Sequence, residues 1–155
     1  MSKGWESSKA THFVSWSWSY SVDVVTTGLH LWARGNGVEL SETYFWICFL
    51  LQQPTQNVAE RRRGSKPHCI FGERLKRIGL MIVLMDSYDG GHYTTRVWCI
   101  FEVYTATMHN IPISVALPGA SKAEFHKKLK DRHFSEIAAS LTSIDAEKAQ
   151  ATFSI

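Results

Sequence analysis

Cysteine is scarce in this chain, and its pattern argues against two classes of protein. Cys48, Cys69 and Cys99 are the three cysteines among 155 residues, and they form no Cys-x-x-Cys pair. An odd number of widely spaced cysteines argues against a disulfide framework, and the seven histidines lack ligand spacing relative to them, so no metal site is expected. Cys48 and Cys99 lie within apolar runs, where we expect them to act as small core residues.

Long apolar runs and a strong charge of one sign are also lacking. No run approaches the roughly 20 apolar residues that cross a bilayer, and polar residues follow positions 1–4, where a secretory signal would have its apolar core. We therefore expect a cytoplasmic protein without a membrane span. The formal charge of +3 is mild, and the basic residues cluster locally at 61–63 and 127–132. This distribution argues against nucleic acid as the main partner.

The chain has enough hydrophobic residues to form one core. With 155 residues, 45% of them hydrophobic and 12% aromatic, the chain suits a single compact domain and is short for two. We expect a flexible lead-in over residues 1–10, one domain over 11–133, and a C-terminal helical extension or tail over 134–155. No internal repeat or low-complexity tract interrupts this organisation.

Strand and helix patterns alternate along the chain. A strand near residues 11–18 ends in a Ser-rich turn, and runs at 43–51 and 80–85 are apolar on both faces, which is typical of strands inside a parallel sheet. A further strand is expected at 113–117. Helical spacing appears over 21–32, 70–78, from 96 to a break at 110–112, from 121, and beyond 134. Ser21 or Asp23 is the expected cap of the first helix, and Ser121 is the expected cap of the helix that follows it at 121. This alternation predicts an α/β fold with a doubly wound, mostly parallel sheet.

The residues after the third expected strand are the first candidate site. Ligands of open α/β sheets bind at the carboxyl ends of the strands, and the helix from residue 96 begins just beyond that edge. Trp98 and Glu102 are four residues apart, so a helix would place an indole and a carboxylate on one face. In the alternative interpretation, Trp98, Cys99 and Tyr104 belong to an ordinary core face and Glu102 lies at its solvated margin.

The end of the first expected strand is a second candidate. Ser15, Trp16, Ser17 and Trp18 combine hydroxyl groups with indoles, which can hydrogen-bond a sugar and stack on a flat ring. Equally, the tryptophans could simply fill the edge of the core. Residues 52–68 form a long polar connection, and its arginines at 61–63 could contact phosphates or belong to a solvated turn.

Three segments resemble the Toll/interleukin-1 receptor (TIR) domain, in particular its divergent branch in protists, algae and fungi. Residues 13–18 resemble the aromatic-aliphatic-Ser motif of the first strand, and residues 80–87 resemble the third strand with its Ser-containing turn. Residues 96–102 closely resemble the Trp-Cys-Leu-x-Glu motif of plant and NAD-cleaving TIR domains. The resemblance implies a flavodoxin-like doubly wound parallel sheet of about five strands with flanking helices.

The same resemblance implies an activity. In NAD-consuming TIR domains the glutamate of this motif is catalytic, and it corresponds to Glu102, while the tryptophan beneath the site corresponds to Trp98. The nucleotide would lie across residues 15–18 and under the loop at 52–67, and we count Trp46 and Arg62 among the substrate-binding candidates. NAD+ would be the substrate, with no further cofactor. A neighbouring subunit commonly completes the pocket, which implies a homo-oligomer acting in defence or stress signalling.

Departures from the motif leave alternatives open. Ser17 and Trp18 stand where many NAD-cleaving relatives have Arg or Gly, and residues 52–54 lack the acidic residue often found there. A second hypothesis is a non-catalytic TIR module that signals by homotypic assembly, and a third is a nucleoside deoxyribosyltransferase-like enzyme, for which no base-binding pattern is present. Whether ADP-ribose or a cyclic isomer would be formed depends on which nucleophile reaches the anomeric carbon.

Overall fold

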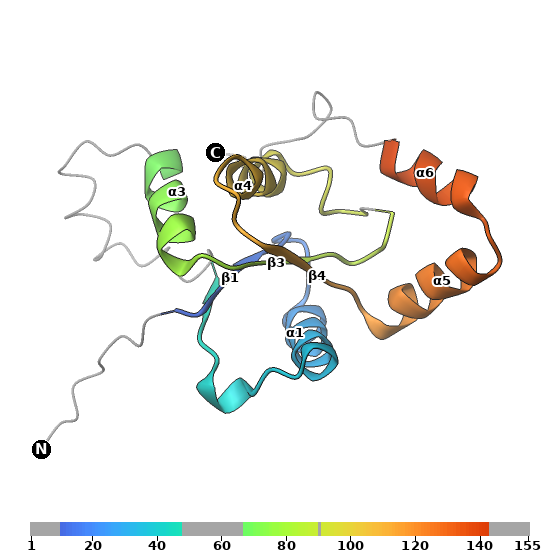
Figure 1. The fold of residues 1–155 in the computed structure, drawn as a ribbon, viewed down its shortest axis with the longest axis horizontal. Helices are drawn as coiled ribbons and strands as arrows, with labels where there is room; N and C mark the ends of the chain where they lie inside the picture. Colours follow the sequence, from blue (N-terminus) through green and yellow to red (C-terminus); the bar gives the residue numbers. More distant parts are fainter. Residues whose placement is uncertain (1–9, 48–66, 90, 143–155) are drawn as a thin grey trace, which may run out of the picture.

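The computed structural model describes residues 10–47, 67–89 and 91–142. Within these residues strands and helices alternate along most of the chain (Figure 1). The elements are β1 (His12–Ser15), α1 (Val22–Asn36), the 3-10 turn η1 (Leu40–Glu42), β2 (Phe45–Ile47), α3 (Pro67–Ile78), β3 (Met81–Leu84), α4 (Val97–Met108), β4 (Ile113–Ala116), α5 (Gly119–Lys130) and α6 (Phe134–Thr142).

The strands form one parallel sheet in the order β2-β1-β3-β4. Phe13 of β1 pairs with Trp46 of β2 on one side and with Met81 of β3 on the other. Helix α1 covers one face of the sheet, and α3 and α4 cover the other (Figure 1). The predicted α/β class and the flavodoxin-like doubly wound arrangement are confirmed, with four strands in the described part of the chain where about five were expected.

Side chains alternate between two cores because successive residues of a strand point to opposite faces. Val14, Ile82 and Leu84 pack with the buried face of α1. Their neighbours in the two strands point the other way, toward α3 and α4. This second cluster comprises Phe13, Met81 and Val83 of the sheet with Leu75, Tyr93, Cys99, Ala106 and Ile111. The predicted burial of β3 on both faces is confirmed, since all four of its residues are buried.

One predicted helix cap is confirmed and the other is wrong. Ser21 caps α1, because its hydroxyl accepts a hydrogen bond from the Val24 amide at 3.3 Å. Helix α5 instead begins at Gly119, two residues before Ser121, and has no side-chain cap. The Ser121 hydroxyl instead accepts a hydrogen bond from the Tyr88 amide at 2.9 Å. This hydroxyl, which the sequence predicted as a helix cap, therefore forms a tertiary contact.

One edge strand differs from the prediction. The strand expected inside the sheet at 43–51 is β2, which pairs only with β1 among the described residues and therefore lies at an edge. Residues 48–51 of the expected strand, including Cys48, lie outside the described part of the chain. At the other edge, Ile113 and Val115 of β4 are exposed. An apolar run thus identified these strands without deciding their place in the sheet, because the neighbours of a strand are far away in the sequence.

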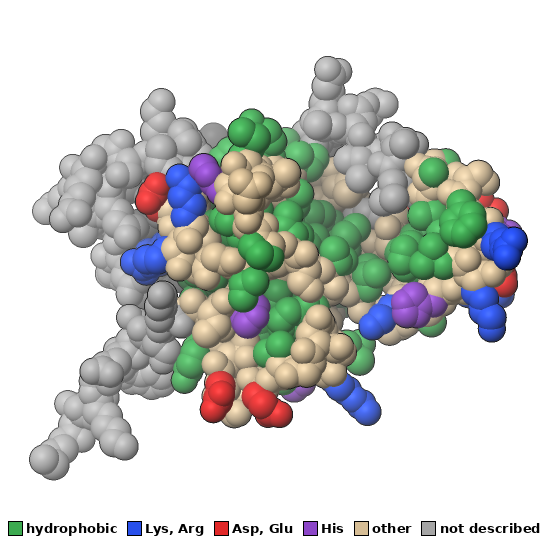
Figure 2. All heavy atoms as spheres, in the orientation of Figure 1, with side chains coloured by type: hydrophobic (Ala, Val, Ile, Leu, Met, Phe, Trp, Pro, Cys, Tyr) green, Lys and Arg blue, Asp and Glu red, His purple; other side chains and the backbone are tan. Residues whose placement is uncertain are grey.

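The C-terminal helices pack against each other beyond β4. Lys128 of α5 pairs with Glu136 of α6 at 3.3 Å, and Ile137 of α6 is buried. Charged side chains gather around these two helices, with hydrophobic ones exposed beside them (Figure 2). None of the helices described here is both long and apolar enough to cross a membrane.

Two glycines of α1 provide a matched test of the contact between helix and sheet. A Cβ at Gly28 would lie 2.5 Å from Cδ1 of the fully buried Leu84, whereas one at Gly35 would meet only the Lys122 ammonium at 3.8 Å. We expect Gly28→Ala to lower the free energy of unfolding by about 1–3 kcal/mol through overpacking. Gly35→Ala should raise it by up to about 1 kcal/mol, because alanine favours the helix. Urea denaturation measures both, and equal effects would contradict the close packing.

Candidate functional site

Helix α4 turns Glu102 toward the sheet. Cys99, Glu102 and Ala106, spaced by three and four residues, are the buried residues of this helix and therefore share its inner face. Glu102 is 6% exposed. The alternative that placed it at a solvated margin is wrong, and Tyr104, which that alternative assigned to the core, is 60% exposed.

The partner of the Glu102 carboxyl is Ser15, the last residue of β1, with which it forms a side-chain hydrogen bond. Ser15 is fully buried, and its Oγ lies 2.5 Å from the hydroxyl of Tyr93. A serine hydroxyl has one hydrogen. If Glu102 is ionised, Ser15 donates its hydrogen to the carboxylate, and Tyr93 must then donate to Ser15. If Glu102 is protonated, the carboxyl donates to Ser15, and Ser15 is free to donate to Tyr93. The three side chains form a chain whose direction depends on the charge of the carboxyl.

Burial dominates the electrostatics of this group. It raises the pKa of Glu102 to about 8, opposed by the hydrogen bond from Ser15, which favours the charged form. Burial also raises the pKa of Tyr93 well above its usual value, so that residue is a neutral donor. No described cation pairs with Glu102. A perturbed carboxyl without an ion pair at the carboxyl edge of a parallel sheet is a candidate for chemistry rather than for a structural salt bridge.

Asp86 organises a second cluster, which the sequence prediction missed. It accepts hydrogen bonds from the Tyr20 hydroxyl at 2.9 Å, the His92 amide at 3.2 Å and the His92 ring at 2.6 Å. Partial burial by itself raises the pKa of Asp86, but the bonds from His92 and Tyr20 outweigh it and the pKa is lowered. Because Tyr93 follows His92, the same segment joins this cluster to Ser15 and Glu102.

Trp46 and Trp98 belong to an aromatic layer between the sheet, α3 and α4. Trp46 stacks on Phe13 with ring centroids 4.5 Å apart, and Phe71 lies 5.7 Å from Trp46 and 6.0 Å from Trp98. The Trp98 Nε1 is buried and has no hydrogen-bond partner among the described residues. Both indoles thus lie in the aromatic layer on the Glu102 side of the sheet, and Trp98 contacts Phe71 of α3.

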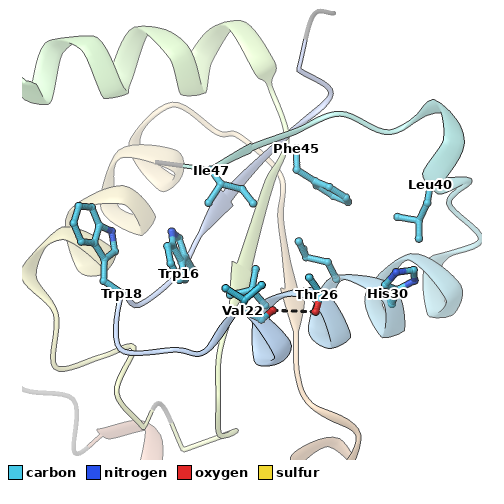
Figure 3. A pocket seen from close by; sticks show the side chains of 10 residues that line it. Trp16, Trp18, Val22, Thr26, His30, Leu40, Phe45 and Ile47 are labelled. Atoms are coloured by element: carbon cyan, nitrogen blue, oxygen red, sulfur yellow. Dashed lines mark hydrogen bonds between the residues drawn. The ribbon is translucent and has the colours of Figure 1, made fainter. Parts of the chain in front are cut away.

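The other predicted site residues are divided between two places. Trp16 and Trp18 line a cavity on the opposite face, between α1 and the strands, and Glu102 is not among its lining residues (Figure 3). Ser17 is fully buried and bonds to the Ser19 hydroxyl at 2.7 Å. Arg62 and the loop expected to cover a nucleotide lie outside the described residues. The structure therefore brings Glu102 and Ser15 together and turns the indoles of Trp16 and Trp18 away from them.

One sequence signal could have found part of the missed cluster. Asp86 comes two residues after β3 ends at Leu84, at the sheet edge where ligands of this fold class bind. Tyr20 is 66 residues away from Asp86 in the sequence, and Tyr93 is 78 away from Ser15, so no local pattern pairs them.

Comparison with protein-family models finds no match to this chain, and comparisons with curated proteins and with solved structures also find none. The resemblance to TIR domains therefore rests on the three sequence segments. In the described part of the chain, no group of three or more His, Cys, Asp or Glu side chains is placed to hold a metal ion.

The buried carboxyl predicts a distinctive pH dependence of stability. The pKa of Glu102 is about 8 in the folded protein and 4.5 ordinarily, so between these values the folded state retains a proton that the unfolded chain has lost. The free energy of unfolding should consequently fall as pH rises from about 4.5 to 8 and level off above. Glu102→Gln, which cannot ionise, should gain on the order of a few kcal/mol relative to the parent between pH 5 and 8.5.

Urea denaturation across this pH range measures the effect. Glu42→Gln, at an exposed position in η1, is the matched control and should follow the parent protein. Parallel stability curves for the parent and Glu102→Gln would contradict the raised pKa.

Proposed function

We propose that this protein is an NAD+ nucleosidase of the TIR type, with Glu102 as the catalytic residue. The observation that carries the proposal is a carboxyl held at the carboxyl end of β1 by a serine hydroxyl, with no described cation to neutralise it. The Trp-Cys-x-x-Glu segment that contains Glu102 adds the resemblance to NAD-cleaving relatives. Self-association through contacts between TIR domains, and a role in cytoplasmic defence or stress signalling, are part of the same proposal.

The chemistry requires one carboxylate. Cleavage breaks the bond between the nicotinamide nitrogen and the ribose, and the electron pair of that bond leaves with nicotinamide, which becomes neutral without taking up a proton. The ribose carbon acquires oxocarbenium character, which a nearby carboxylate stabilises. Water then adds to this carbon and loses a proton to solvent to give ADP-ribose. If an adenine nitrogen of the same molecule adds instead, a cyclic isomer results.

The hydroxyl neighbours suit a group that must become charged for this step. Ser15 can donate to the ionised Glu102 while Tyr93 donates to Ser15, so the negative charge is stabilised by a buried chain of donors. Burial withholds solvent from the carboxylate, which strengthens its attraction for a developing positive charge. The positively charged nicotinamide ring of the substrate would itself favour ionisation of Glu102 on binding.

The alternative is a non-catalytic TIR module, and the burial of Glu102 is the observation that favours it. At 6% exposure the carboxyl could serve only to tie α4 to β1. In that case its loss would affect folding or assembly without altering any turnover. The two functions are separated by measuring turnover and folding on the same variants.

Glu102→Gln should reduce nicotinamide release from NAD+ at least 100-fold while the fold is retained, because glutamine keeps the hydrogen bonding but not the negative charge. Release is followed by chromatography over a range of protein concentrations, with circular dichroism to verify folding. Glu42→Gln, exposed and remote in sequence from the motif, should retain full activity. Unchanged release by Glu102→Gln would overturn the assignment of Glu102, and no release by the parent at any concentration would favour the non-catalytic module.

The rate should also depend on pH through the ionisation of Glu102. Because the pKa of Glu102 in the free protein is about 8, and the carboxylate is the active form, kcat/KM should rise with pH and approach a plateau above that value. Initial rates between pH 6 and 9.5 at low NAD+ concentration test this. A profile that is flat from pH 6 upward would show that the active carboxyl has an ordinary pKa.

A further inference from the structure

The cavity lined by Trp16 and Trp18 is separate from Glu102. It lies on the α1 face of the sheet, whereas Glu102 lies under α4 on the other face (Figures 1 and 3). Its volume of about 490 Å³ is within the range of small-molecule sites. Glu102, Ser15 and Tyr93 do not line this cavity, so a ligand of the cavity would be distinct from a ligand of the Glu102 site.

The lining of this cavity is almost entirely apolar. The Thr26 hydroxyl is engaged by its own helix, because it donates to the Val22 carbonyl at 2.9 Å. Among the described residues that line it, His30 is the single titratable side chain, and none is a lysine, arginine or acid. A dinucleotide with its phosphates would be left without partners there, since buried charges require pairing. The cavity therefore suits a hydrocarbon and excludes NAD+.

The cavity is elongated along α1. Val22, Thr26 and His30 line it at intervals of four residues, which corresponds to about 12 Å along a helix axis. Trp18 lies at one end, and His30 and Leu40 lie at the other (Figure 3). Phe45 and Ile47 of β2 form the opposite wall, together with Trp16, which directly follows β1. A trough of this shape accommodates an extended alkyl chain along its length.

A second cavity of about 420 Å³ adjoins the trough and has both polar and apolar side chains in its lining. The two share His30 and Leu40 as lining residues, and the second also includes Arg34, Glu39 and Ser41. Arg34 has no ion-pair partner among the described residues. A guanidinium with an adjacent imidazole and a serine hydroxyl is suited to a carboxylate. The two cavities thus border each other at His30 and Leu40, and the second one offers donors to an anionic head group.

We propose that the joined cavities bind a medium-chain fatty carboxylate. The alkyl chain would lie along α1 toward Trp18, and the carboxylate would contact Arg34 and His30. Arg34, rather than the net charge of the pocket, carries this assignment, because Glu39 is also among the described lining residues and its charge is opposite to that of Arg34. This site goes beyond the proposed nucleosidase activity and does not depend on it.

Titration of the full chain with decanoate, below its micelle concentration and at pH 7, tests the proposal by calorimetry and by tryptophan fluorescence. Saturable one-to-one binding is expected. Octanoate should bind about 15-fold more weakly, because it has two methylene groups fewer and each buried methylene group is worth roughly a fourfold change in affinity. Decanol and decyltrimethylammonium should bind more weakly than decanoate. Absence of saturable binding, independence from chain length, or a preference for the cationic head group would each overturn the proposal.

Two matched variants localise the site. Val22→Glu places a carboxylate on the cavity wall but at the first position of α1, where an acid is compatible with the helix dipole, so it should fold and lose decanoate binding at least tenfold. Thr27→Glu adds the same charge at an exposed position of α1 that does not line the cavity, and it should bind like the parent. Equal binding by both variants would place the ligand elsewhere.

Arg34→Gln tests the head group. It should weaken decanoate at least fivefold and leave decanol unchanged, whereas an equal loss for both ligands would show that Arg34 does not recognise the carboxylate. Glu102→Gln should bind decanoate like the parent, so a failure of the nucleosidase proposal and a failure of this one are distinguishable.

Discussion

The contact between α4 and the carboxyl end of β1 is the constraint on which the candidate site depends. A glutamate on the inner face of a helix costs free energy unless it is hydrogen-bonded or neutral, and here Glu102 meets the buried hydroxyl of Ser15. The Tyr93 hydroxyl forms a second hydrogen bond with that of Ser15. The segment between β3 and α4 must place Tyr93 beside Ser15. The hydrogen bonds of Asp86 with Tyr20 and His92 stabilise this segment.

The parallel sheet separates two kinds of chemistry because its strands alternate. Ser15 points to the α4 face and contributes to a polar, titratable cluster, whereas Trp16 points to the α1 face and lines an apolar cavity. Two consecutive residues, Ser15 and Trp16, therefore belong to two separate sites on opposite faces of the sheet. The thiol of Cys99 donates to the Trp16 carbonyl at 3.4 Å, so the backbone at this point is contacted from α4 as well.

Most of the fold was predictable from local patterns. The alternation of helical and strand periodicity identified the sheet, Ser21 was expected at the start of α1, and the apolar run at β3 predicted its burial. Edge positions were not predictable in this way. Placing β2 and β4 at the edges depends on the order of pairing, which joins segments far apart in the sequence.

The sequence by itself determined which residues could carry chemistry: Glu102 on a helix that follows a central strand, and Ser15 at the end of the first strand. Only the tertiary structure decided that these two meet, that Tyr93 joins them, and that Trp16 and Trp18 face the other side. The physical reason is that helical spacing specifies which residues share a face, but the identity of the opposing surface is set by packing of the whole chain. The same packing removes the carboxyl from water and so raises the pKa of Glu102.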